Sequence, residues 1–383
     1  MISGFGFGLD FIVSFFSYLL PFLFVLALVV FIHELGHFLV GRYFGVRVET
    51  FSLGFGPRLF SRYDRQGTEW AISAIPLGGY VKFKGDADAS SQPDHAAAAA
   101  MPEQDRHDSF PHKPVAQRAA IVAAGPLANF ILAFVIFSVS FMVVGRTMFQ
   151  PIIAGIGENS PAAAAGFKAG DRVLKINGEA VESFEDVARR ISLSEGQSIT
   201  FLIDRDGREV DLSATPHVVM RKSVLGTERR PVMGFIGSQD RAHQFTRRFG
   251  LAEATGTAAQ EIYFVIDRTV AYIGGLIAGR EKADQLSGPV RIGYISGKVA
   301  EAGIGPLMIL AGILSISIGF INLLPIPMLD GGHLVFYAAE ALRGRPVSPR
   351  AQEWSFRVGF GLVLALMLFS TWNDILHLTG LAS

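Results

Sequence analysis

The segment Phe31-Ile32-His33-Glu34-Leu35-Gly36-His37 ends a long apolar run and contains the pattern H-E-x-x-H. On a helix, His33 and His37 lie four residues apart on one face, so both imidazoles can bind one zinc ion. Glu34 can then take a proton from a water molecule bound to the metal. The preceding run, Phe11 to Ile32, carries no charge. Ionisable groups at the end of such a run are costly, which favours a metal site over a pair of buried structural histidines.

The composition indicates an integral membrane protein. Half of the 383 residues are hydrophobic, and the mean hydropathy is +0.37. The formal net charge is zero, which argues against nucleic acid as a partner, because no basic excess is available to neutralise phosphates. The chain has no cysteine, so any zinc must be bound by His, Asp or Glu, the ligand type of catalytic sites. The N-terminal run has neither a basic start nor a cleavage site and is expected to stay in the lipid bilayer.

Four apolar segments predict about four transmembrane helices. Residues 1–42 form the first, with the H-E-x-x-H pattern, and residues 115–146 form the second. Residues 304–383 contain the third and fourth, together with the sequence Leu329-Asp330-Gly331.

Residues 43–114 are predicted to form a cytoplasmic β-rich loop followed by a disordered segment. Short apolar runs between turn signals in 48–84 predict two or three β-strands. These strands are either a plain surface hairpin or an edge that holds a substrate segment by β-augmentation, and the sequence leaves both open. Residues 86–113 contain few large apolar residues, so we expect disorder there. Their histidines (His95, His107 and His112) are expected to be solvated rather than metal ligands.

The second apolar segment contains Gly125-Pro126-Leu127-Ala128-Asn129. Small residues allow helices to approach closely, and an Asn in the membrane usually faces protein. Asn129 either hydrogen-bonds a neighbouring helix, which we favour, or orients a group of the active site.

Residues 147–217 resemble a PDZ domain. The order is a strand, a short helix near Ser160–Gly166, a strand and turn over 170–178, an amphipathic helix over 183–192 and a strand pair. PDZ domains bind extended peptides along a strand edge. Residues 218–303 are expected to form a helical region in the periplasm or at the membrane surface. Within it, Asp267 and Arg268 interrupt an apolar stretch, which favours a surface helix over a fifth crossing.

Lys and Arg crowd residues 42–118 and recur in 326–354, which places these loops in the cytoplasm. With four crossings, both termini and the PDZ-like domain then face the periplasm, and the site lies near the cytoplasmic side. His33 and Asp330 arrive at similar depth at the ends of spans one and three. Asp330, an acidic group at the end of an apolar stretch, is a candidate third metal ligand, and His333 is its rival; the preference for Asp330 depends mainly on the resemblance described next.

The sequence resembles the site-2 protease family (M50) of intramembrane zinc metalloproteases, in the RseP-like type (regulator of sigma-E protease). The motifs that carry this resemblance occur in the family's order along most of the chain. They are His33–His37, Gly54–Pro57, Leu77–Val81, Gly125–Asn129, the PDZ-like block, Leu286–Val290 and Asn322–Gly332. This chain departs from the best-known members in carrying a single PDZ-like unit.

The resemblance implies a zinc metalloendopeptidase of the site-2 protease type, with one Zn²⁺ per chain. His33, His37 and Asp330 would bind the ion, and Glu34 would act as the general base. The enzyme would hydrolyse peptide bonds within or near the transmembrane segments of single-span substrates in the bacterial inner membrane. Such regulated intramembrane proteolysis acts on proteins such as a trimmed anti-sigma factor or remnant signal peptides.

The resemblance also assigns residues to substrate binding. Asn322 would bind or polarise the substrate near the site, and the strand region at Gly78, Gly79 and Tyr80 would engage its unwound segment. The expected partners are therefore a single-span membrane protein and a peptide or protein ligand of the PDZ-like domain. The expected fold is a multi-pass α-helical membrane protein with a membrane-associated β-hairpin region and one periplasmic PDZ-like α/β domain.

Two other functional classes compete with this interpretation. A membrane scaffold or chaperone would use the PDZ-like unit and carry a vestigial zinc motif, but the intact Glu34 and a plausible third ligand count against it. A metal transporter would need several intramembrane acidic or histidine sites along a path. The sequence offers one such cluster, near one membrane face.

Overall fold

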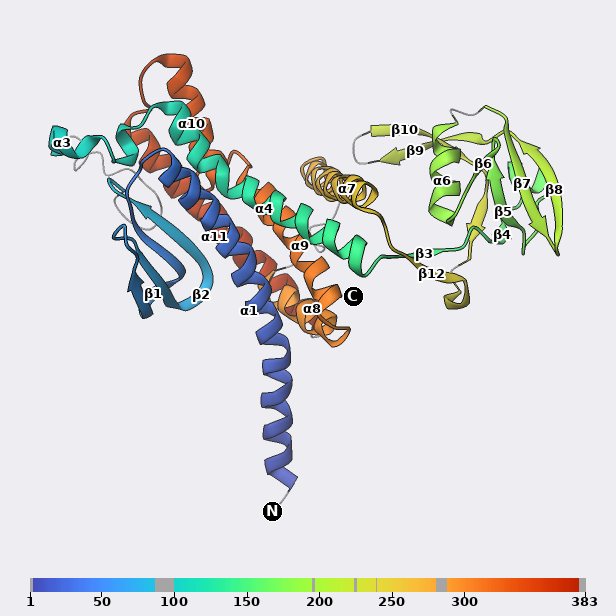
Figure 1. Ribbon diagram of the computed structural model, residues 1–383, viewed down its shortest axis with the longest axis horizontal. Coiled ribbons are helices and arrows are strands. Elements are labelled where there is room, and N and C mark those ends of the chain that lie inside the picture. The colour runs from blue at the N-terminus through green and yellow to red at the C-terminus, as the bar shows by residue number, and fades with distance from the viewer. Residues whose placement is uncertain are drawn as a thin grey trace. The chain divides into compact units, whose positions relative to one another are not determined.

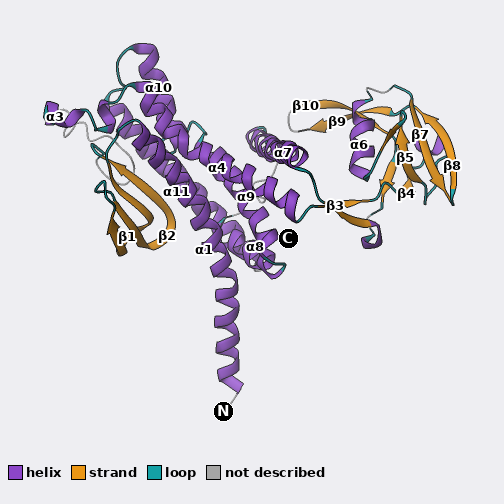
Figure 2. Ribbon diagram, in the orientation of Figure 1, coloured by secondary structure: helices purple, strands orange, loops and turns teal. Residues whose placement is uncertain are grey.

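The structure is a computed structural model of the chain, and it describes residues 3–86, 100–194, 197–223, 226–238, 240–279 and 288–378. It divides into two compact units. The first, here the helical unit, comprises Met1–Ser140, Thr255–Thr269 and Lys282–Ser383. The second, here the PDZ-like unit, comprises Phe141–Ala254 and Val270–Glu281. Figure 1 labels the elements, and Figure 2 separates helices from strands.

Four described helices are long and apolar enough to cross a membrane, as the sequence predicts. They are α1 (Ser3–Tyr43), α4 (Val115–Val143), α9 (Ile304–Asn322) and α11 (Pro349–Leu378). Helix α11, the fourth of these, begins at Pro349, so it includes polar residues that precede the apolar part of its sequence. Helix α7 (Leu251–Ile277) does not meet the same criterion of length and composition.

Shorter helices pack among these four. Helix α8 (Pro289–Glu301) contacts α1, α9 and α11. Its first turn is capped by Asp374 of α11, whose carboxylate accepts from the backbone N–H groups of Gly288 and Arg291, both at 2.9 Å. Helix α10 (Asp330–Arg343) begins at the predicted metal ligand. Because α10 starts where the loop after α9 ends, the position of Asp330 depends on how that loop packs.

The strands of the helical unit form one antiparallel hairpin of β1 (Val48–Tyr63) and β2 (Glu69–Phe83). The first half of β1 is buried, whereas the residues from Phe55 onward are exposed. At the turn, Asp64 accepts from the backbone N–H groups of Gln66 and Thr68 and pairs with Arg42 at the end of α1. The hairpin is thereby fixed to the helix that carries the H-E-x-x-H pattern.

Part of the segment expected to be disordered is ordered. Residues 100–113 contain α3 (Glu103–Arg106) and η1 (Phe110–His112). Phe110 is buried and stacks on Phe83 with ring centroids 5.2 Å apart, while Lys84 pairs with Asp105 and Asp108. One aromatic ring and one cation thus anchor a segment of otherwise polar composition. The remainder, residues 87–99 with His95, lies outside the described residues.

The PDZ-like unit contains the expected order of elements (Figure 1). Its antiparallel sheet has the strand order β6-β5-β7-β8, and α6 begins with a capping box between Ser183 and Asp186. The buried core includes Ile153, Phe167 and Phe201. The elements are β4 (Ile153–Ile156), α5 (Pro161–Ala164), β5 (Arg172–Ile176), β6 (Glu179–Ala180), α6 (Phe184–Leu193), β7 (Ile199–Arg205) and β8 (Arg208–Ala214).

The segment after residue 217 differs from the helical region expected there, because strands precede its helix. β11 (Phe235–Gly237) pairs with β4, so it covers an edge that would otherwise expose unpaired backbone groups. The pairing of β12 with β3 then joins the two ends of the unit. The remaining elements are β3 (Arg146–Phe149), β9 (His217–Ser223), β10 (Gly226–Val232), η2 (Arg241–His243) and β12 (Gln244–Arg247).

Candidate active site

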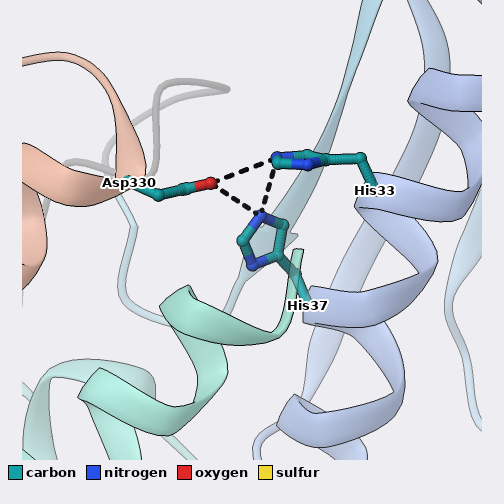
Figure 3. A group of neighbouring side chains, drawn as sticks. All are labelled: His33, His37 and Asp330. Carbon is teal, nitrogen blue, oxygen red and sulfur yellow. Dashed lines mark hydrogen bonds and ion pairs between the residues drawn. The ribbon is translucent and has the colours of Figure 1, made fainter. Parts of the chain in front are cut away.

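Three side chains from α1 and the start of α10 point at one another (Figure 3). Nε2 of His33 lies 3.1 Å from Oδ2 of Asp330, and Nε2 of His37 lies 3.6 Å from the same oxygen. The two Nε2 atoms are 3.3 Å apart. The structure therefore brings His33, His37 and Asp330 together, with ligand atoms within 4.8 Å of one another. His333 is not in this group.

The donor set fits a zinc ion. Oδ2 of Asp330 is buried, and the described groups that it pairs with are the two Nε2 atoms. Ligands about 2.0–2.2 Å from a tetrahedral zinc ion lie about 3.3–3.6 Å from one another, close to the separations observed. Two imidazoles and one carboxylate leave a fourth position for water or substrate, as in catalytic zinc sites.

Each histidine is oriented by α4 through its second ring nitrogen. Nδ1 of His37 donates to the backbone oxygen of Ile121 at 2.9 Å. Nδ1 of His33 lies 3.2 Å from the side-chain amide of Asn129, whose oxygen is buried without another described partner. With that oxygen turned toward His33 it accepts from Nδ1–H, since the two ends of an amide differ only in hydrogen bonding. Both Nε2 atoms are then free to bind a metal.

Asn129 thus has the site-orienting role that sequence analysis disfavours, in addition to a structural one. Its backbone oxygen accepts from Oγ of Ser315 on α9 at 2.9 Å, and its side chain is fully buried. A single residue of α4 therefore connects the metal-ligand helix α1 with α9.

Small residues set the close approach of α1 and α4. A Cβ atom on Gly125 would lie 2.2 Å from Nε2 of His37. A Cβ atom on Gly36 would lie 2.3 Å from the backbone oxygen of Ala124. Side chains at these two glycines would displace the helices or the ligand, which explains the glycines in both motifs.

The loop before α10 is packed with equal closeness. Cβ atoms on Gly331 and Gly332 would lie 2.2 Å from the oxygen of Leu324 and 2.4 Å from that of Ile326. Met328 has a φ of +84°, an uncommon conformation for a residue with a side chain. This packed turn determines where the Asp330 carboxylate enters the site.

A cavity of 720 Å³ surrounds the three candidate ligands. Sequence analysis did not assign Phe55, Met328 or Phe356 to it, although Phe55 and Met328 lie in motifs that carry the family resemblance. Every predicted site residue lines it: His33, Glu34, His37, Gly78, Gly79, Tyr80, Asn322 and Asp330, together with His333.

Strand β2 lies directly against Glu34. A Cβ atom on Gly79 would lie 3.1 Å from Cγ of Glu34 and 2.9 Å from Val30 on the same helix. The backbone N–H of Val81 donates to the Glu34 carboxylate. Gly79 therefore has a packing reason, since a side chain at this position would collide with α1.

Four helices long and apolar enough to cross a membrane, together with a buried His-His-Asp cluster beside a glutamate, are typical of a membrane-bound metal-dependent hydrolase. Residues 21–366 match the model of peptidase family M50. The chain belongs to this family, the site-2 proteases, and is a zinc metalloprotease.

The chain is similar to curated relatives over nearly their whole length. The chain is 47% identical to a protein of Agrobacterium fabrum named "putative zinc metalloprotease", covering 95% of this chain and 97% of that protein. It is 40% identical to metalloprotease MmpA of Caulobacter vibrioides, covering 95% and 96%. Among solved structures, the PDZ domain of an SdrC-like protein from Listeria monocytogenes is similar. The match covers 24% of this chain and 90% of that domain's chain, with 18% identity and a TM-score of 0.20.

Proposed function

We propose that this protein cleaves single-span membrane proteins within or near their transmembrane segments, in regulated intramembrane proteolysis. The observation that carries the proposal is the convergence of three metal-ligand atoms, from the first apolar helix and from the turn after the third, in a cavity that Glu34 also lines. A trimmed anti-sigma factor and remnant signal peptides are the substrate types proposed.

The proposed roles follow from the geometry. His33, His37 and Asp330 hold one zinc ion, which acidifies a water molecule and polarises the scissile carbonyl when bound. Glu34 takes the proton of the attacking water and returns it to the leaving amine. The N–H of Val81 keeps the Glu34 carboxylate oriented while it accepts and releases this proton.

The substrate segment must be extended before it is cut, because the backbone of a helix is hydrogen-bonded and closed to attack. Among the described strands, β2 pairs only with β1, and Gly78, Gly79 and Tyr80 line the cavity. An unwound substrate can pair with β2 by β-augmentation. Asn322, at the end of α9, lines the same cavity and offers an amide to the substrate backbone.

The proposed location is the bacterial inner membrane, with both termini and the PDZ-like unit in the periplasm. The concentration of Lys and Arg in residues 42–118 and 326–354 supports this orientation. The site would then lie near the cytoplasmic side.

In the PDZ-like unit, β11 pairs only with β4 among the described strands, so its second edge can accept an extended peptide.

Glu34→Gln tests the proposal. We expect the variant to retain one zinc per chain and to lose turnover by about 10³-fold or more, because the amide cannot accept the proton of water. The measurement co-expresses each variant with a single-span substrate whose outer domain is removed and follows substrate length on a gel. Metal content is measured on the purified proteins.

Glu353→Gln is the matched control, because Glu353 is an exposed carboxylate on α11 that pairs only with Arg357 in the described structure. It should cleave like the wild type. Equal cleavage by the wild type and Glu34→Gln would refute the mechanism and favour a scaffold built around the PDZ-like unit.

A further inference from the structure

His333 is a second buried imidazole in the active-site cavity, and the mechanism above gives it no role. It lies three residues after Asp330 on α10, so both side chains project from the same face of that helix. It is 7% exposed and lines the cavity. Its ring packs against Phe356 of α11, with centroids 5.2 Å apart and planes inclined by 44°. The imidazole is therefore held in place without being a member of the candidate ligand group.

Neither ring nitrogen of His333 has a hydrogen bond or ion pair within the described residues. His33 and His37, by contrast, each use one nitrogen on α4 and direct the other toward Asp330. Neither nitrogen is among the described side-chain atoms that are fully buried without a partner, so the ring can present a nitrogen to the open space of the cavity. A fixed imidazole with no described protein partner, in a cavity where a peptide must lie, therefore has a nitrogen available to a group of the substrate.

We propose that His333 is a catalytic residue whose neutral imidazole donates a hydrogen bond to the scissile carbonyl oxygen as that oxygen becomes anionic. The inference rests on the proposed function. Donors aimed at the oxygen that develops charge give large rate effects, because they stabilise the transition state more than the bound substrate. Glu34 is unsuited to this task, since it moves the proton between water and the leaving amine. The proton of His333 stays on the imidazole throughout.

The location of His333 fits this division of roles. Glu34 projects from α1, with β2 packed against its side chain. His333 projects from α10, next to Asp330. The substrate carbonyl at the centre would therefore meet the proton acceptor from one element and the proposed donor from another.

Variants of His333 separate this role from metal binding and from packing. His333→Leu removes the donor, whereas His333→Gln and His333→Asn place an amide N–H near the positions of Nε2 and Nδ1. We expect His333→Leu to lower kcat by about 10²–10³-fold, with KM within about threefold and one zinc per chain. One of the two amide variants should recover kcat by about tenfold, which would also identify the donating nitrogen.

The measurement uses the full-length protein in detergent with a purified single-span substrate, and zinc content is determined on the same samples. A kcat of His333→Leu within about threefold of the wild type overturns the proposal. Loss of zinc from both His333→Leu and His333→Gln overturns it too, because it would show a ligand or packing role. If His333→Leu fails to fold, the comparison of His333→Gln with His333→Asn tests the proposal instead. An equally low kcat in both of these variants, with normal zinc content, also overturns the proposal.

Wild type and Glu34→Gln are assayed in parallel. This comparison distinguishes a failure of the proposed function from a failure of the role proposed for His333. Equal cleavage by these two overturns the proposed function and the role of His333 with it. A difference between them, combined with wild-type kcat in His333→Leu, overturns only the role of His333.

Discussion

Both units contain glycines required by backbone conformation and glycines required by close packing, and one set from each unit illustrates the two functions. In the PDZ-like unit, Gly166, Gly170, Gly178 and Gly207 adopt positive φ, and no atom lies within 4 Å of where a Cβ would be. These are turn glycines, chosen for their backbone conformation. In the helical unit, a Cβ atom would meet a neighbour at 2.0–2.8 Å at Gly36, Gly125, Gly288, Gly297, Gly312, Gly331 and Gly332. Here glycine is required by close packing between elements.

Buried carboxylates also differ in how their charge is stabilised. In the PDZ-like unit, Asp171 is 1% exposed and meets the guanidinium of Arg205 through two contacts of 2.7 Å. In the helical unit, Asp374 is fully buried and is satisfied by backbone N–H groups of α8. Oδ2 of Asp330 faces Nε2 of His33 at 3.1 Å. In the helical unit, backbone N–H groups thus stabilise the charge of Asp374, a guanidinium stabilises that of Glu69, and we propose a metal ion for Asp330.

The sharpest test of the glycine contrast is Gly125→Ala. The new Cβ would overlap Nε2 of His37, so we expect the histidine to move and turnover to fall by about 10²-fold or more, with reduced zinc affinity. Gly170→Ala, in open space in the PDZ-like unit, is the matched control and should leave zinc content and cleavage near the wild-type level. Normal zinc content and turnover in Gly125→Ala would show that the α1–α4 contact does not position the ligand.

A smaller effect is expected from Asp171→Asn, which leaves Arg205 without its carboxylate. We expect a measurable loss of stability of the PDZ-like unit, smaller than for a fully buried pair, because Asp171 is buried whereas the Arg205 side chain is 24% exposed. Thermal unfolding, or protease sensitivity of this unit in the full-length protein, measures the loss. Asp211→Asn, a carboxylate on β8 for which the described structure shows no ion pair, is the control. An unchanged midpoint would indicate that the pair makes no net contribution.

The same pair predicts a pH dependence. Burial acts to raise the pKa of Asp171, but the hydrogen bonds from Arg205 and from the Lys168 N–H hold it below its ordinary value of 3.8. Its stabilising contribution is therefore complete above that value and is lost as the pH falls further, through the lowered pKa of the folded protein. Unfolding measured from neutral pH downward should show a loss below about pH 4 that Asp171→Asn lacks. Identical acid sensitivity in both proteins would contradict this assignment.

Removing the cap on α8 should have a more modest effect. In Asp374→Asn one carboxylate oxygen becomes an N–H donor, so the N–H group of Gly288 or Arg291 loses its acceptor, at a cost of about 1–2 kcal/mol. The thermal midpoint in detergent should fall relative to both the wild type and Glu353→Gln. A midpoint equal to that of the wild type would mean that α8 is held by its side-chain packing alone.

The smallest effect is expected at a turn glycine. Gly178 has a φ of +81° with open space around it, so Gly178→Ala should cost about 1 kcal/mol through backbone strain alone. Gly178→Asn should cost less, because Asn tolerates this conformation better. The midpoints of thermal unfolding of the two variants show which one has lost more stability. A larger loss in Gly178→Asn would show that space, rather than conformation, limits this position.

The sequence by itself determined the local parts of this protein. Four apolar segments, the i,i+4 spacing of His33 and His37, and the order of the PDZ-like elements between 147 and 217 depend on neighbours in the chain, and periodicity reveals them. Asp330 was a candidate because an acidic group that ends an apolar segment is rare and costly, and it was preferred over His333 mainly because of the family resemblance. The contact of Asn129 with His33 joins residues 96 positions apart, and no local pattern encodes it.

The tertiary structure alone decided how the site is oriented. The packing of Gly79 and Val81 against Glu34, the fit of Gly125 over His37 and the exclusion of His333 from the ligand group depend on which helix faces meet. It also placed Phe110 against Phe83 and paired β11 with β4, where composition predicted disorder and helix. The physical reason is that such contacts form between segments distant in sequence, so their energies enter only when the chain is folded.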